Sequence, residues 1–180
     1  MHKYNLKSTS SVLFIAILVI GVFSFVPSSY ADRVITLQKV SNVNETTLLT
    51  ILSDVSEYPQ IFPDNVKFVK ILDNNTKLVE MNAGINGIFF DTQAIITTDA
   101  NGNYIVHVVS GDLKGTVMTT SLEQTWGFQG QKDGGTIANI ALDVKTSGFL
   151  SWMINFVPDG SLSDALGYGF DKFVQHVQTT

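Results

Sequence analysis

The stretch SLSDALGYGFDKFVQHV, residues 161–177, predicts one amphipathic helix near the end of the chain. Its apolar side chains recur at spacings of three and four, the period of one face of an α-helix. They are Leu162, Leu166, Phe170, Phe173, Val174 and Val177. Ser161 and Asp164 have the spacing of a capping box, and Pro158-Asp159-Gly160 is expected to stop the preceding segment. One face of this helix therefore needs an apolar partner.

The partner has to be a β-sheet, because almost everything upstream is strand-like. Apolar runs alternate with turn signals rich in Asn, Asp and Gly, and each turn is short enough for a hairpin. The runs cover residues 34–43, 66–72, 77–83, 88–98, 104–109, 116–128 and 136–145. Strands joined by such short turns are antiparallel. The sequence therefore predicts an α+β fold, in which a curved seven-stranded antiparallel sheet wraps around the C-terminal helix.

One helical segment interrupts the strands near their start. Asn44 has the character of an N-cap, and the apolar face after it runs from Leu48 to Val55. Pro59 and Pro63 are expected to end this helix at a sharp corner or a second short helix, because proline cannot continue a helical hydrogen-bond ladder.

The first 31 residues are expected to lie outside this domain, which spans residues 32–180. Lys3 and Lys7 precede an almost unbroken apolar run at 12–26, and Ser29 and Ala31 are the small residues that a signal peptidase reads. This pattern predicts export with cleavage before Asp32. An uncleaved anchor is the alternative, although a spanning helix needs about 20 apolar residues.

Export would leave an acidic domain without covalent cross-links. Removing residues 1–31 takes away two lysines and no acidic residue, so the formal charge falls from −5 to −7. An acidic surface argues against nucleic acid as a partner. The chain has no cysteine, which excludes disulfides and a lipoprotein anchor.

Strand alternation assigns a set of apolar side chains to the inner face of the sheet. Together with the final helix they are the predicted ligand-binding residues: Phe90, Met118, Leu122, Trp126, Phe128, Leu166, Phe170 and Phe173. The same side chains would also make an ordinary filled core, and the pattern alone does not separate the two.

The order of elements, the segment DVSEYPQIFP at 54–63, and the WGF and GGT tripeptides at 126–128 and 134–136 resemble the START-like (SRPBCC) superfamily. The chain is most similar to its coenzyme Q-binding and polyketide cyclase/dehydrase-like branch. This resemblance implies a helix-grip fold with an apolar cavity for lipids, isoprenoids, quinones or aromatic polyketides. Members of that branch are typically intracellular or mitochondrial, so the export signal argues against a respiratory-quinone role.

Catalytic candidates are few. His107, Asp91 and Tyr58 could transfer protons if they faced a cavity, but His107 lies in a strand whose two faces are both apolar. Asp54, Glu57 and Tyr58 are better explained as residues that position the proline corner. No metal-ligand motif, nucleophile motif or phosphate-binding glycine loop is present, so no metal or cofactor is expected.

The segment 148–157 is unusually apolar for a linker. Its aromatic and sulfur-containing side chains predict a lid over a portal, a patch that touches a membrane transiently, or a short core helix. They are Phe149, Trp152, Met153 and Phe156. Asn44 and Asn74 begin glycosylation sequons, of which the turn residue Asn74 is the better site.

Three functions remain open at this point. The first is an exported carrier that binds a hydrophobic small molecule without catalysis. The second is a polyketide cyclase or dehydratase that uses a cavity-facing histidine or aspartate. The third is a ligand-free interaction module. A titratable group facing the interior would favour the second, and a completely filled interior the third.

Overall fold

The computed structural model describes residues 33–85, 87–111, 113–125, 134–146 and 156–179. The strands are β1 (Arg33–Ser41), β2 (Val66–Asp73), β3 (Leu78–Ile85), β4 (Ile88–Thr98), β5 (Tyr104–Ser110), β6 (Val117–Thr125) and β7 (Gly135–Val144). The helices are α2 (Glu45–Ser53), the 3-10 turn η1 (Val55–Glu57), α3 (Tyr58–Ile61) and α5 (Asp159–Thr179). Each predicted strand is present, with ends that differ by at most a few residues.

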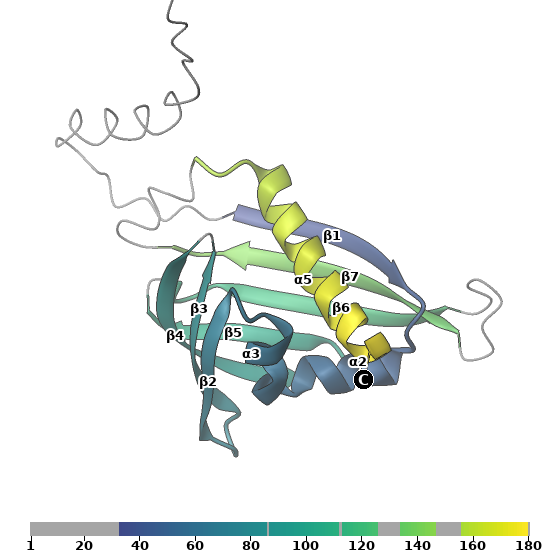
Figure 1. Ribbon diagram of the computed structural model, residues 1–180, viewed down its shortest axis with the longest axis horizontal. Helices are drawn as coiled ribbons and strands as arrows, with labels where there is room; N and C mark the ends of the chain where they lie inside the picture. Colours follow the sequence, from purple (N-terminus) through teal and green to yellow (C-terminus); the bar gives the residue numbers. More distant parts are fainter. Residues whose placement is uncertain (1–32, 86, 112, 126–133, 147–155, 180) are drawn as a thin grey trace, which may run out of the picture.

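The seven strands form one antiparallel sheet in the order β1-β7-β6-β5-β4-β3-β2. Strands β2 to β7 are neighbours in chain order, as hairpin turns require. The exception is β1, which crosses to the far edge and pairs with β7. Figure 1 shows α5 running diagonally across the concave side of this sheet and ending beside α2. The predicted α+β helix-grip architecture is confirmed.

The segment between β1 and β2 is a capped helix followed by a tight corner. The Asn44 side chain accepts a hydrogen bond from the Thr47 amide at 2.8 Å, so it is the predicted N-cap of α2. The second short helix, one of the two alternatives expected after α2, is α3, and Pro59 lies in its first turn. Proline is tolerated there because a first-turn amide has no intrahelical partner.

Helix α5 begins two residues before the predicted start. Asp159 and Gly160 belong to its first turn, and the Pro158 carbonyl accepts hydrogen bonds from the Ser161 and Leu162 amides. Pro158 precedes the helix as expected, but the placement of Asp159 and Gly160 before it was wrong, because Asp159 suits the positive end of the helix dipole. The apolar face is as predicted, with buried residues Leu162, Phe170 and Phe173.

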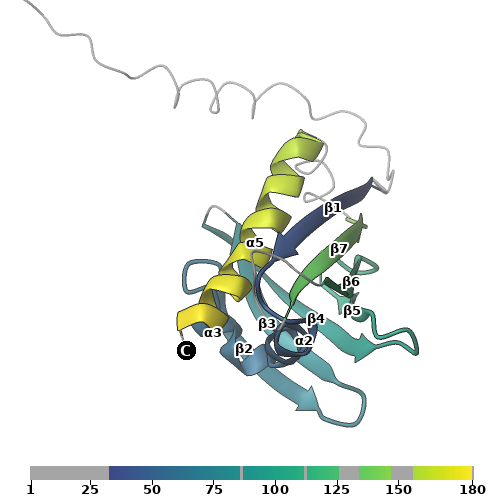
Figure 2. The ribbon, with the colours of Figure 1, turned by 90° about the vertical axis from the view of Figure 1, so that its right-hand side faces the viewer.

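Helix α5 approaches the sheet most closely at β1, and its C-terminal half also packs against α2 and α3. At Gly167 an added Cβ would lie 3.4 Å from Leu37 Cδ2 and 3.7 Å from Lys39 Nζ. Glycine therefore lets the helix lie against this strand, which explains a residue that is otherwise a poor helix former. Figure 2 shows α5 from the side, next to β1 and β7.

Polar contacts join β1 and the residue after it to α5 along the whole length of the helix. An ion pair lies near the start of α5, a second ion pair of 2.8 Å near its middle, and a hydrogen bond of 2.6 Å near its end. The pairs are Arg33 with Asp159, Lys39 with Asp171, and Asn42 with Gln178. Each is at least partly exposed, so each contributes about 0–1 kcal/mol and together they fix the register of helix on strand.

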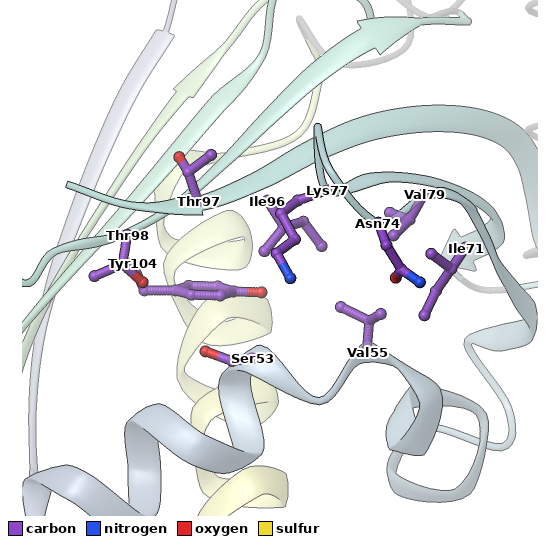
Figure 3. A pocket seen from close by; sticks show the side chains of 10 residues that line it. All are labelled: Ser53, Val55, Ile71, Asn74, Lys77, Val79, Ile96, Thr97, Thr98 and Tyr104. Atoms are coloured by element: carbon purple, nitrogen blue, oxygen red, sulfur yellow. The ribbon is translucent and has the colours of Figure 1, made fainter.

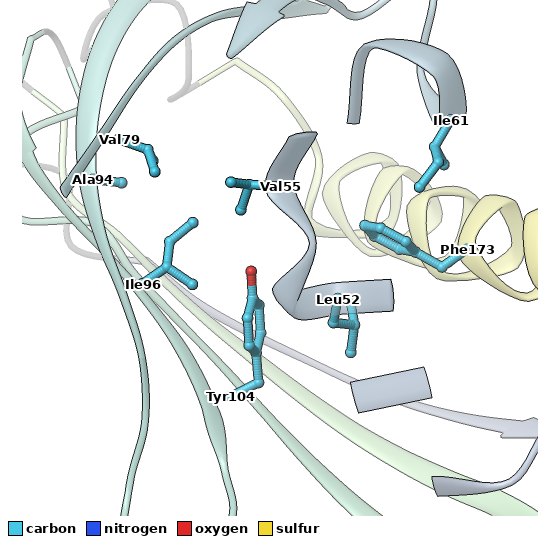
Figure 4. Close-up of a cluster of buried hydrophobic side chains, with 8 residues drawn as sticks. All are labelled: Leu52, Val55, Ile61, Val79, Ala94, Ile96, Tyr104 and Phe173. Carbon is cyan, nitrogen blue, oxygen red and sulfur yellow. The ribbon is translucent and has the colours of Figure 1, made fainter. Parts of the chain in front are cut away.

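Two clusters of buried apolar residues form the core. The first, which we call the tyrosine core, consists of Leu52, Val55, Ile61, Val79, Ala94, Ile96, Tyr104 and Phe173 (Figure 4). The second consists of Val43, Leu48, Ala138, Ile140 and Phe170. Met118 and Leu122 of β6 pack against both clusters. Among the residues described, no helix is long and apolar enough to cross a membrane, and the predicted leader lies outside these residues.

Candidate ligand-binding surface

Three apolar side chains lie next to one another on the inner face of the adjacent strands β5, β6 and β7 and are only partly buried. In the strand register Val106 of β5 is opposite Met118 of β6, and Met118 is opposite Leu142 of β7. We call Val106, Met118 and Leu142 the open row. Side chains in the interior of a fold are normally buried completely, so the partial exposure of these three shows that this part of the inner face is not completely covered.

The neighbouring row, two residues further along the same strands, is closed. It consists of Tyr104, Thr120 and Ile140, which are 1%, 2% and 6% exposed. Leu52 of α2 packs around Tyr104, and Leu48 of α2 lies in the same cluster as Ile140. Helix α2 therefore fills one end of the interior, and the open row lies beyond it.

Uncharged side chains dominate the inner face of the sheet. The alternation in β3 to β7 directs Val79, Ala94 and Val108 inward, together with threonines such as Thr92 and Thr120. Among the described residues of these five strands, Tyr104 is the one titratable side chain on that face. A ligand against this surface would meet mostly apolar groups.

The Tyr104 hydroxyl is already engaged. It lies 2.7 Å from the Tyr58 hydroxyl, which in turn donates to the Leu52 carbonyl at 2.7 Å. A carbonyl can only accept, so Tyr58 uses its proton there and Tyr104 must donate to Tyr58. Burial raises the pKa of Tyr58 well above its usual value and raises the pKa of Tyr104 to about 12. Both side chains stay neutral near pH 7, and Tyr58 has no proton to offer a substrate.

The other two catalytic candidates lie on the outer face. His107 is exposed on β5, with Ile95 and Val117 as its strand neighbours. Asp91 is exposed on β4 and accepts a hydrogen bond of 2.6 Å from Asn82. The structure does not bring these residues together with Tyr58, and neither faces the interior. Metal ligands are also not gathered: no group of three His, Asp or Glu side chains that could hold an ion occurs within the described ranges.

Most of the predicted ligand-binding residues that the structure describes face the interior. Phe90, Met118 and Leu122 are partly buried on the inner face, and Leu166 is partly buried on α5. Phe170 and Phe173 are buried, each in a different cluster. Phe173 packs edge-on against Tyr58 and Phe62, with ring centroids 5.3 and 5.0 Å apart.

Several predictions fall on residues outside the described ranges. These are Trp126, Phe128, Phe149, Trp152 and Met153, and they stay predictions. Phe156 is described and is 67% exposed just before α5. Sequence reasoning did not select Val106 and Tyr104, because β5 is apolar on both faces apart from His107.

Comparison with solved structures supports the architecture. A START superfamily protein from Mycobacterium smegmatis matches with a TM-score of 0.58 and 16% identity, over 82% of this chain and 93% of that chain. A major latex-like protein from Panax ginseng gives a TM-score of 0.61 and 15% identity, over 81% and 97%. The Zhui aromatase/cyclase from a Streptomyces species matches with a TM-score of 0.56 and 11% identity, over 82% of this chain and 94% of that chain.

The chain has the START-like helix-grip fold. The three matches cover most of both chains, and the strand order and the position of the final helix agree with that architecture. At these identities the likeness establishes the START-like fold and not a shared ligand. No protein family profile matches the sequence, and no curated protein matches it.

Proposed function

We propose that this START-like protein is a non-enzymatic carrier that binds a hydrophobic small molecule between the inner face of the sheet and α5. The observation that supports this most directly is the open row, three apolar side chains that face α5 and are not fully covered. Burying such a surface against a ligand stabilises a complex by about 25 cal/mol per Å² of apolar area.

The chemistry of the surface limits the ligand class. Met118 and Leu122 offer flexible apolar contacts, and methionine adapts to ligands of irregular shape. A lipid, an isoprenoid, a quinone or an aromatic polyketide would suit such a surface. Specific polar recognition would come from a small number of groups, as in most small-molecule sites.

An enzymatic role has less support. Proton transfer requires a titratable group within hydrogen-bond reach of the substrate. Among the described residues of the inner face, Tyr104 is the one titratable side chain, and its proton is donated to Tyr58. One structurally similar protein is named as an aromatase/cyclase, but His107 and Asp91, the groups that would perform such chemistry here, lie on the outer face.

The leader sequence makes export part of the proposal. Residues 1–31 have the pattern of a secretory signal, so the carrier would act outside the cytoplasm or at a cell surface. N-terminal sequencing of the protein from its own source tests this, and an N-terminus at Asp32 is the expected result. An intact Met1 in a soluble intracellular fraction would contradict it.

Ligand identification is the decisive experiment for the carrier function. Native mass spectrometry of the purified protein, followed by solvent extraction, should reveal a stoichiometric hydrophobic molecule. Met118→Lys should abolish its retention, because a charge would be buried against the ligand. Thr119→Lys, on the opposite face of the same strand, is the matched control and should retain it.

A second variant guards against misfolding of the first. Leu142→Trp keeps the surface apolar and occupies the space above the open row, so the folded variant should lose the ligand. The carrier proposal fails if the wild-type protein is empty and binds none of a panel of lipids, isoprenoids and quinones. It also fails if both folded open-row variants retain the ligand as the wild type does.

A further inference from the structure

A pocket lies beside the end of α2, and one of its lining residues, Ile96, is the strand neighbour of Val106 in the open row. Its volume is about 400 Å³, within the range of small-molecule sites. Figure 3 shows the side chains that line it: Ser53, Val55, Ile71, Asn74, Lys77, Val79, Ile96, Thr97, Thr98 and Tyr104. We call it the Lys77 pocket. Nothing in the proposed carrier function uses it.

The lining of this pocket is divided between an apolar floor and a polar rim. Val55, Val79 and Ile96 belong to the tyrosine core and present their outer side to the pocket. Ser53 and Asn74 contribute uncharged polar groups at the rim. This division suits a ligand that has an apolar body and one polar end.

Lys77 supplies the single cationic group of the lining. Figure 3 shows its side chain directed into the pocket, toward the side where the Tyr104 hydroxyl lies. No described ion pair or side-chain hydrogen bond engages its amine, whereas Arg33, Lys39 and Lys145 each have a carboxylate within 4 Å. The amine is therefore free to meet a ligand.

The backbone of Lys77 is a second, independent sign. Its φ of +56° is in the left-handed region, and every other described residue with a positive φ is a glycine. A non-glycine residue is strained in that region, where Gly or Asn is the usual choice. Lysine at this position therefore has a cost to folding, in a hairpin whose strand register is also irregular.

Two carboxylates are next in sequence to residues of the lining, Asp73 before Asn74 and Asp99 after Thr98. Asp73 accepts hydrogen bonds from the Asn75 amide and the Thr76 hydroxyl, and Asp99 accepts from Asn101 and Asn103. These bonds lower the pKa of both carboxyl groups and keep them ionised in their own turns. With such neighbours a dianion such as phosphate would be repelled more than a single carboxylate.

We propose that the Lys77 pocket binds a small amphipathic monocarboxylic acid. The Lys77 ammonium group would donate to the carboxylate, and the apolar body would lie against Val55, Val79 and Ile96. The Tyr104 oxygen, whose own proton goes to Tyr58, can accept a hydrogen bond from a hydroxyl group on the ligand. An aromatic or short-chain acid has the size that this volume admits.

Titration with benzoate, followed by backbone NMR, tests the proposal on the purified protein. Benzoate should shift the amide signals of Ser53, Lys77 and Thr98 in a saturable way. Benzamide has nearly the same shape without the charge, so it should bind at least tenfold more weakly. Raising the salt concentration should weaken benzoate binding, because the amine is exposed and its charge is screened.

Two variants and one control locate the interaction. Lys77→Gln should weaken benzoate binding at least tenfold, whereas Lys70→Gln, an exposed lysine on β2, should leave it unchanged. Ser53→Phe alters an exposed residue at the rim and should block the pocket while Lys77 stays in place. Circular dichroism checks that each variant is folded.

The outcomes separate this pocket from the carrier site. If benzoate shifts only the open-row residues Val106, Met118 and Leu142, or shifts no signal at all, the proposal is overturned. It is also overturned if the folded Lys77→Gln variant binds as the wild type does, or if benzamide binds equally well. Loss of the shifts in Lys77→Gln together with continued retention of a hydrophobic molecule would support two separate sites.

Discussion

Two adjacent rows of side chains on the same three strands differ sharply in how they are covered. Tyr104, Thr120 and Ile140 are almost completely buried, whereas Val106, Met118 and Leu142, two residues away on each strand, are only partly buried. The first row is covered by α2 as well as α5, and the second lies beyond α2. The difference teaches that the short helices after β1 set the boundary between the core and the space offered to a ligand.

Truncating a side chain should destabilise the protein more in the tyrosine core than at an exposed site on the same helix. Phe173 is buried among the rings of Tyr58 and Phe62, so Phe173→Ala should lower the free energy of unfolding by about 3–5 kcal/mol. Tyr168 on the same helix is 54% exposed, and Tyr168→Ala should change it by less than about 1 kcal/mol. Urea denaturation measures both. Equal effects of the two substitutions on the free energy of unfolding would mean that the tyrosine core is not what stabilises the fold.

Enlarging a side chain should also destabilise the tyrosine core more than the open row. Ala94 is 1% exposed in the tyrosine core, so Ala94→Leu should destabilise by about 2–3 kcal/mol through overpacking. Val106→Leu, in the open row, should cost less than about 1 kcal/mol because space is available. Thermal unfolding of the two ligand-free variants provides the comparison. A penalty at Val106 as large as that at Ala94 would show that the open row is filled.

The tyrosine pair tests the hydrogen bonds of the closed side. Tyr58→Phe removes the hydroxyl that joins Tyr104 to the Leu52 carbonyl, and it should cost about 1–2 kcal/mol at neutral pH. A double-mutant cycle with Tyr104→Phe separates the contribution of the pair from that of each ring. Additive effects of the two substitutions would count against a coupled pair.

The same pair predicts how stability depends on alkaline pH. The folded pKa of Tyr104 is about 12, above the ordinary value of 10, so the folded state retains a proton that the unfolded state releases. The stability from this group is thus complete below pH 10 and falls as the pH rises from 10 to 12. The double phenylalanine variant should lose less stability over this interval, as measured by urea denaturation at each pH.

The smallest effect is expected at Lys77, outside both rows. Lys77→Gly relieves the left-handed backbone strain and should raise the free energy of unfolding by about 0.5–1 kcal/mol after the entropic cost of glycine is counted. Lys70→Gly, in the extended strand β2, should lower it by a similar amount. A loss of stability in Lys77→Gly would show that the lysine side chain stabilises the fold.

The fold was predictable because its signals are local. The side chains of turn residues such as Asp73 and Asp99 accept a hydrogen bond from the backbone amide two residues later. Such residues therefore mark the ends of strands in the sequence. The apolar period of α5 is likewise a local signal, and it is recognisable despite the three glycines of the helix. The start of α5 was misplaced because Pro158 and Gly160 favour both a helix start and a turn.

The candidate site was less predictable, because it depends on what covers each strand. Tyr104 to Val109 is apolar on both faces apart from His107, so no alternation in that segment reveals the inner side. Leu142 and Ile140 share one face and differ only in their contact with α2, a tertiary relation that no local pattern contains. The direction of the Lys77 side chain depends on a left-handed backbone conformation, and no sequence pattern predicts that conformation for lysine.

The pairing of β1 with both β7 and α5 also governs the order in which the chain can fold. Arg33 is opposite Val144 in the sheet, so the first strand has no strand partner until more than a hundred further residues have been synthesised. Its contacts with Asp159, Asp171 and Gln178 wait longer still. In a chain that leaves the ribosome in this order, β1 therefore stays without its strand and helix partners until the end of the chain has appeared.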